Sequence, residues 1–230
     1  MKNPAAGGGR WVDVPPERLV SWIVTFTQRH GAGSVTDDAA GATVTFNAAD
    51  GAVAECHPPF PPLRPAGSDD PAAGAEAIVA HATAERTVGV LLVRLGGYAV
   101  GVFAGSPPRL VSSKAGSRLV HGRSAAGGWS QHRFARRREN QAATALRAAA
   151  DAAAGIFRPH HLDALVLGGD KRSVSGLRGD PRLAPYLGLA TDRFLTVPDP
   201  RLAVLKETPR SFLAIRIRLT EPEYSGPAPG

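Results

Sequence analysis

A glutamine that follows a pair of glycines is the most chemically suggestive feature of the sequence. Gly127 and Gly128 are separated from Gln131 by Trp129 and Ser130. Glycines allow a backbone to approach a ligand closely, and a helix that begins behind them offers free amide N–H groups and a positive dipole end. Glutamine is no general base near neutral pH, but its amide and backbone N–H can orient a water or stabilise an oxyanion. The set suits a reaction in which something else supplies much of the catalytic surface. A flexible hairpin tip before a helix explains the same spacing without chemistry.

The residues around this glutamine are strongly basic. No acidic residue occurs from Arg86 to Arg138, an interval that includes ten lysines and arginines with both of these end residues counted. Folded domains normally mix both charge signs on their surfaces, so this interval indicates a surface that faces a polyanion, although an ordinary solvated helix face is the alternative. Trp129 can stack on a nucleotide base. The predicted RNA-binding residues are Lys114, Arg118, Arg123, Trp129, His132, Arg133, Arg136, Arg137 and Arg138.

The composition of the whole chain is consistent with an anionic partner. The net charge is +7 and the isoelectric point is about 10.3, values that bear on association and not on fold. A GC-rich genome would also inflate arginine together with alanine, glycine and proline. The clustering of positive charge in one interval favours the binding interpretation.

Strands and one long helix are expected to position the glutamine. Runs rich in valine and leucine, separated by glycine turns, predict a three-stranded antiparallel meander. A helix is expected over 131–154, with Ser130 as its N-cap and Gly155 as its end. Its arginine-rich first half would project, while its alanine-rich second half would pack on the sheet. The three strands are expected at residues 86–95, 98–104 and 110–113.

The remainder of the chain predicts a mixed sheet flanked by helices. Strands at 164–167, 194–197 and 212–219 alternate with helical segments after the opening meander, which is the pattern of an α/β or α+β domain. Gly168 to Lys171 loosely resembles a phosphate-binding loop, and we interpret it as a strand-to-helix turn.

The N-terminal part predicts a small α/β module. A helix is expected from Pro15 to about His30, followed by a hairpin of strands 42–47 and 51–56. The proline-rich segment 58–74 is interpreted as a linker or surface loop. The predicted organisation is a module with its linker at 1–80, a catalytic domain at 81–220 and a disordered tail at 221–230.

The cellular context follows from what the sequence lacks. It has no apolar run long enough for a spanning helix and no secretory signal at its start, so we expect a cytoplasmic protein that does not bind membranes. Cys56 is the only cysteine, which excludes an internal disulfide and a cysteine-rich zinc site. We predict no metal and no cofactor.

The run from Gly127 to Arg138, GGWSQHRFARRR, resembles a known family. It follows three strands and precedes a long helix, as in the central domain of eukaryotic and archaeal class I release factors. There a Gly-Gly-Gln tip is followed by an Arg-Phe-x-Arg-x-Arg helix start. It is more similar to the Vms-like release factor (VLRF) family of peptidyl-tRNA hydrolases, bacterial branch, which the segment 90–102 also resembles. The resemblance extends over residues 86–219.

This resemblance implies an RNase H-like mixed sheet and a tip that enters the peptidyl-transferase centre of the large ribosomal subunit. Gln131 would be catalytic, Gly127 and Gly128 would form its loop, and the basic residues would contact tRNA or rRNA. The expected activity is release of a stalled nascent chain from peptidyl-tRNA by a monomer. In this chain Trp129 and Ser130 separate the glutamine from the glycines. Hydrolysis of the ester and cleavage of the tRNA near its 3′ end therefore both remain open.

Two further classes of function fit the residues. A non-enzymatic RNA- or ribosome-binding module could use the same basic surface. An RNase H-like nuclease is the third reading, and it would need a carboxylate set that is not evident in the sequence.

Overall fold

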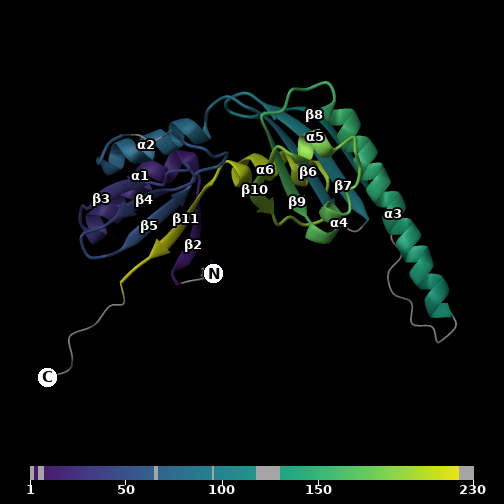
Figure 1. The fold of residues 1–230 in the computed structure, drawn as a ribbon, viewed down its shortest axis with the longest axis horizontal. Coiled ribbons are helices and arrows are strands. Elements are labelled where there is room, and N and C mark those ends of the chain that lie inside the picture. Colours follow the sequence, from purple (N-terminus) through teal and green to yellow (C-terminus); the bar gives the residue numbers. More distant parts are fainter. Residues whose placement is uncertain (1–2, 5–7, 65–66, 95, 118–129, 223–230) are drawn as a thin grey trace. The chain divides into compact units, whose positions relative to one another are not determined.

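The computed structural model describes residues 3–4, 8–64, 67–94, 96–117 and 130–222, with the side chains of 3–4 and 130–142 excepted. The chain divides into two compact units (Figure 1). The first unit consists of residues 1–84 together with 213–230, and the second consists of residues 85–212. The second unit is therefore inserted into the first.

The first unit contains a six-stranded sheet in which every pairing is antiparallel. The predicted hairpin is confirmed: β4 pairs with β5, and Gly51 adopts a φ of 88° in the turn between them. The order across the sheet is β1-β2-β11-β5-β4-β3. The strands are β1 (Asn3–Pro4), β2 (Arg10–Val14), β3 (Ser34–Asp37), β4 (Val44–Asn47), β5 (Val53–His57) and β11 (Ile215–Thr220).

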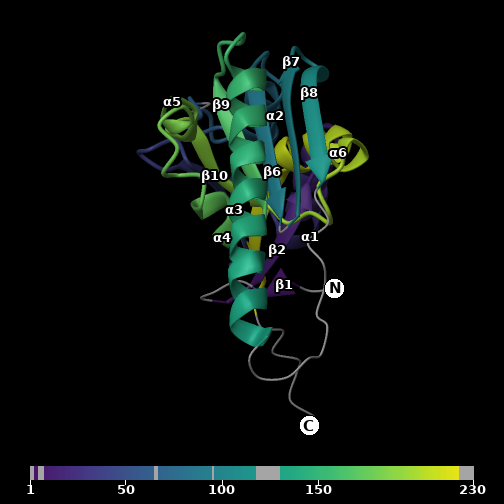
Figure 2. The same ribbon diagram turned by 90° about the vertical axis from the view of Figure 1, so that its right-hand side faces the viewer.

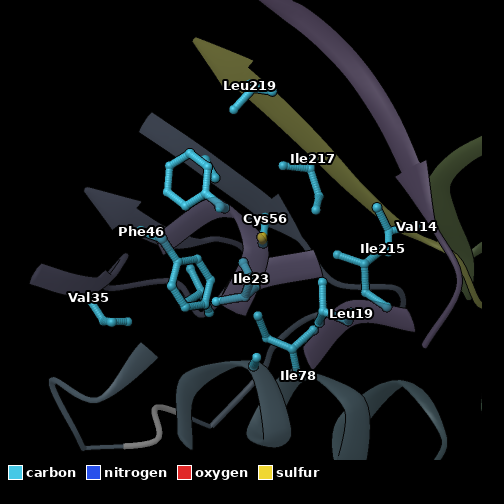
Figure 3. Packing of buried hydrophobic residues seen from close by; sticks show 14 of the residues in the cluster. Val14, Leu19, Ile23, Val35, Phe46, Cys56, Ile78, Ile215, Ile217 and Leu219 are labelled. Carbon is cyan, nitrogen blue, oxygen red and sulfur yellow. The ribbon is translucent and has the colours of Figure 1, made fainter. Parts of the chain in front are cut away.

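Two helices, α1 (Pro16–His30) and α2 (Pro71–Ala82), pack on this sheet and on each other. The predicted helix is confirmed as α1, which ends at Gly31 with a φ of 83°. Leu19 and Ile23 of α1 are fully buried and face the strands (Figure 3). Each strand of such a sheet directs alternate side chains towards the helices. This apolar layer is the core of the first unit.

The second unit contains a five-stranded mixed sheet with the order β10-β9-β6-β7-β8. Strands β6, β7 and β8 form the predicted antiparallel meander. Strand β9 runs parallel to β6, and β10 runs parallel to β9. The mixed sheet that was predicted for this part of the chain is therefore confirmed. The strands are β6 (Thr87–Arg94), β7 (Gly97–Ala104), β8 (Arg109–Ser117), β9 (Ala164–Gly169) and β10 (Ala190–Leu195).

Helices cover both faces of this second sheet. The long helix α3 contacts β6, β7 and β8 (Figure 2). Val100 and Val102 belong to the core on this side of the sheet. Phe103 has the opposite orientation because side chains alternate along a strand, and it packs against Phe212 of α6. The helices are α3 (Ser130–Phe157), α4 (Lys171–Ser175), α5 (Ala184–Leu187) and α6 (Leu202–Phe212).

The last strand lies in a different sheet from the one predicted. Residues 212–219 were expected to close the sheet of the main domain, but β11 lies between β2 and β5 of the first unit. Its side chains alternate between buried and outward-facing positions, a pattern that fits any sheet with one covered face. The alternation predicts a strand but does not specify its partners.

The proline-rich segment is part of the first unit and is not a boundary between units. Its second half contains the start of α2, for which the Asp70 carboxylate accepts a hydrogen bond from the Ala72 N–H. Its first half is tied to that helix, because His81 Nε2 lies 2.9 Å from the Phe60 carbonyl oxygen. The division between units falls instead between residues 84 and 85.

Candidate functional site

Strand β8 leads from the sheet into the predicted tip. It is an edge strand of the second sheet, and most of its residues are at least partly exposed. Lys114 is exposed and lies opposite Val100 in the register. Residues directly opposite each other in an antiparallel pair share a face of the sheet, and Val100 belongs to the face that α3 covers. Lys114 therefore lies on the same face of the sheet as α3.

Helix α3 has a packed half and a projecting half. It contains 28 residues, which corresponds to about 42 Å. Its C-terminal part is anchored, with Ala149, Ala153 and Phe157 buried in the core. Leu146 packs against the edge of that core, which leaves about 24 Å of helix between Ser130 and the anchored part. Figure 2 shows these first turns extending past the strands of the sheet.

The anchored half confirms the expected packing of the alanine-rich segment, but the helix does not end at Gly155. It continues to Phe157, although a glycine inside a helix costs about 1 kcal/mol relative to alanine. The complete burial of the Phe157 side chain, which contacts Tyr186 with ring centroids 5.3 Å apart, offsets that cost.

The backbone of Gln131 lies in the first turn of α3, which begins at Ser130. The helical backbone also includes the positions of His132, Arg133, Arg136, Arg137 and Arg138. Positions 133, 136 and 137 fall on one helical face, because residues three and four apart are neighbours on a helix. The other predicted site residues, Arg118, Arg123, Gly127, Gly128 and Trp129, lie outside the described residues.

One edge of the second sheet, the edge at which β8 ends, gathers further polar groups. Strands β6, β8, β9 and β10 all end at this edge, and such an edge is where ligands usually bind in open mixed sheets. Arg94 extends across it, and its Nη1 donates a hydrogen bond of 2.9 Å to the Val197 carbonyl. Sequence reasoning did not single out Arg94. The signal that could have found it is a cation as the last residue of an otherwise buried strand.

The glycine pair at the end of β9 forms a strand-to-helix turn, as predicted. Gly169 has a φ of 102°, and Asp170 caps the five-residue helix α4. The pKa of Asp170 is lowered, first by the hydrogen bond from the Ser173 hydroxyl and then by the Ser173 backbone N–H. The Asp170 carboxylate therefore serves as the N-cap of its own helix, α4.

Two further observations concern the described part of the chain alone. Its histidines, cysteine and carboxylates form no group of three that could hold a metal ion. None of its helices combines the length and the apolar character needed to cross a membrane.

The chain was compared with known proteins. A model of a release-factor family matches residues 86–218, which is more than half of the 230 residues. The matched segment contains the glycine pair, Gln131 and all the predicted RNA-binding residues. The class of protein is therefore that of the release factors. The chain belongs to the family described as Actinobacteria/chloroflexi VLRF1 release factor.

Two solved structures are similar to the chain. One is the crystal structure of an archaeal translation termination factor, aRF1, with 14% identity and a TM-score of 0.41. The other is an archaeal protein with 13% identity and a TM-score of 0.35. Each comparison covers 86% of this chain and 62% of the other, so the chain spans less than two thirds of these relatives. A comparison with proteins of curated function found no match.

Proposed function

We propose that the chain is a ribosome-rescue peptidyl-tRNA hydrolase that frees stalled nascent chains from tRNA on the large ribosomal subunit. The observation that carries the proposal is the family match over 86–218, which includes a Gly-Gly-x-x-Gln sequence in an acid-free basic interval. In this proposal the chain acts as a cytoplasmic monomer without a metal or cofactor. The tip enters the peptidyl-transferase centre, where rRNA supplies the rest of the catalytic surface.

The proposed chemistry is hydrolysis of the ester that joins the peptide to the tRNA. Gln131 orients a water whose oxygen attacks the ester carbonyl carbon, and N–H groups at the start of the helix stabilise the oxyanion. The bond from that carbon to the 3′-terminal ribose oxygen breaks. The ribose oxygen leaves with a proton from the water, and the peptide keeps the hydroxyl on its new carboxyl group. Gln131 is neutral throughout, so its role is positioning and not proton transfer.

The proposed RNA contacts follow the projecting half of α3 and the neighbouring edge strand. Arginine forks bind phosphate in a bidentate manner. Lys114 lies on the α3 face of the sheet and is exposed, so it would extend the same basic surface. Because these contacts release counterions, binding to the subunit should weaken steeply as salt rises.

Single-turnover release tests the role of Gln131. Purified large subunits that carry stalled peptidyl-tRNA are mixed with the wild type or with Gln131→Ala. Loss of one transition-state donor typically lowers the rate by about 10²- to 10³-fold, and we expect that loss with unchanged binding to the subunit. Gln141→Ala, the same chemical change further along α3, should release peptide at the wild-type rate. Equal rates for Gln131→Ala and Gln141→Ala would exclude the assigned role.

Sequencing the 3′ end of the released tRNA identifies the broken bond. An intact terminal adenosine supports ester hydrolysis, whereas a shortened 3′ end would show that the chain cleaves the tRNA as an endonuclease. Tight, salt-dependent binding with neither product would leave the chain a non-enzymatic ribosome-binding module.

A further inference from the structure

The first unit contains a groove between α1 and the strands β2 and β11. Its volume is about 440 Å³, within the range of sites that hold small ligands. The residues that line it come from positions 10–30, 219 and 221, so none belongs to the segment 86–218 that the family match covers. The groove is therefore a feature of this chain that the release-factor match does not explain.

The Glu221 carboxylate lies among three basic side chains in this groove, which Asp13 also lines. Glu221 is 3.5 Å from Arg10, 4.0 Å from Arg29 and 3.8 Å from His30, measured between the charged or ring nitrogen and a carboxylate oxygen. All three distances exceed those of well-formed charge-assisted hydrogen bonds. The Arg29 side chain is 72% exposed. The basic groups thus converge on a position for an anion without binding the present one tightly.

The third basic group, the His30 imidazole, is oriented by the Asp50 carboxylate on the side away from Glu221. His30 Nδ1 lies 2.8 Å from an Asp50 carboxylate oxygen, which leaves Nε2 directed towards Glu221. Asp50 is itself fixed by the Ala52 backbone N–H, and this hydrogen bond, followed by the one with His30, lowers its pKa. The imidazole is therefore oriented before any ligand arrives.

Two stacked aromatic side chains, Trp22 and Phe26, line the groove together with the basic groups. The rings of Trp22 and Phe26 are stacked, with centroids 5.8 Å apart and an interplanar angle of 5°. Phe26 is buried, whereas Trp22 is half-buried and lines the groove. Arg18 also lines it and lies one turn before Trp22 on the same face of α1. An accessible indole between arginines is a platform on which an unpaired base can stack.

We propose that this groove binds single-stranded RNA, with a phosphate in the place of the Glu221 carboxylate and a base stacked on Trp22. Phosphate suits the three basic groups because arginine binds it through paired N–H groups. An acidic peptide would satisfy the same groups but would supply no base to stack on the indole. A duplex keeps its bases stacked inside and offers none to Trp22. The inference concerns the first unit and does not depend on the proposed hydrolase activity.

The experiment uses Trp22 as a local reporter. The chain has three tryptophans, so Trp11→Phe and Trp129→Phe leave Trp22 as the only indole. Replacing Arg133, Arg136 and Arg137 with Gln in the same full-length chain reduces competing binding at the tip. An adenine-rich single-stranded oligonucleotide is titrated against tryptophan fluorescence, and we expect saturable quenching. The same sequence as an RNA duplex should quench far less.

Charge variants then test the anion position. Arg29→Gln should weaken binding several-fold and lower the slope of log affinity against log salt by about 0.7, the value for one contact to a single strand. Glu221→Gln should strengthen binding, because the competing carboxylate is removed. Arg64→Gln, an exposed arginine of the same unit that does not line the groove, should change the affinity no more than general charge screening does.

Three results would overturn the inference. The first is an absence of quenching at any RNA concentration. The second is an equal effect of Arg29→Gln and Arg64→Gln, which would indicate non-specific attraction. The third is equal quenching by a polyglutamate peptide, which would assign the groove to an acidic protein segment.

Discussion

Replacing Ile217 with alanine should selectively destabilise the first unit. Ile217 is fully buried in the middle of β11, opposite Val12 on one side and Cys56 on the other. The substitution removes three carbons at about 0.8 kcal/mol each and leaves a cavity, so we expect a loss of about 3 kcal/mol. Ile217→Val removes one carbon and should cost about 1 kcal/mol. The two variants together give a graded test.

Two probes in the first unit report this loss. Trp11 and Trp22 both belong to it, so in a Trp129→Phe background tryptophan fluorescence follows that unit alone. With a urea dependence of about 2 kcal/mol per molar, the midpoint for Ile217→Ala should fall by about 1.5 M. Cys56 is the second probe: it is buried, and burial raises the pKa of its thiol. Labelling by a thiol reagent therefore requires opening, and its rate should rise about 100-fold.

Hydrogen exchange separates this effect from general destabilisation. Peptides from β4 and β5 should exchange faster in Ile217→Ala, because they belong to the same sheet. An unchanged tryptophan midpoint, combined with faster exchange in β6 and β9, would refute the placement of β11 in the first sheet.

Two further predictions concern the second unit. Gly169→Ala should cost about 2–3 kcal/mol in the unfolding free energy of this unit, measured in thermal melts, because a side chain at a φ of 102° is strained and the new Cβ would meet the backbone carbonyl of Val93. Gly155→Ala, at an open helical position, should instead stabilise the unit by about 0.5–1 kcal/mol in the same melts. Arg182 lowers the pKa of Asp180 through a side-chain hydrogen bond. The ionised carboxylate therefore stabilises the fold at neutral pH, and this stabilisation is lost as the pH falls below about 4 and through the lowered pKa. A stability difference between wild type and Arg182→Gln that persists unchanged at pH 2 would contradict this assignment.

Local sequence patterns predicted most of the helices and strands whose formation depends on residues close together in the sequence. The helix that became α1, the hairpin around Gly51 and the meander of β6 to β8 each carry a clear period and a glycine at the turn or end. The start of α3 at Ser130 was also predicted to within one residue. These signals succeed because capping and alternation act within a few residues.

Long-range partners could not be read from such patterns. Strand β11 was recognised as a strand but assigned to the wrong sheet, because alternation does not identify a neighbour. Helix α2 was missed because it starts within the proline-rich segment, although Asp70 and Pro71 form a typical helix start. Its alanine-rich sequence has little amphipathic contrast, so its burial depends on α1.

Among the candidate functional residues, too, those close together in the sequence were predicted and those brought together by the fold were not. Spacing within the sequence singled out Gln131 and the arginines that follow it. The groove of the first unit was not predicted, because Arg10, Arg29 and Glu221 meet only when the two ends of the chain come together. A site assembled from segments far apart in the chain has no characteristic spacing of residues in the sequence.

The central position of β11 determines the order in which the protein can be completed during its synthesis. Strands β2 and β5 emerge early, yet each lacks a neighbour until β11 is made after the whole second unit. The unit translated first is therefore the last to close its sheet. A prematurely ended product could contain an intact second unit but would lack Leu219 and Glu221, and with them one side of the groove. Only a chain translated as far as Glu221 would combine the release-factor unit with the proposed RNA-binding groove.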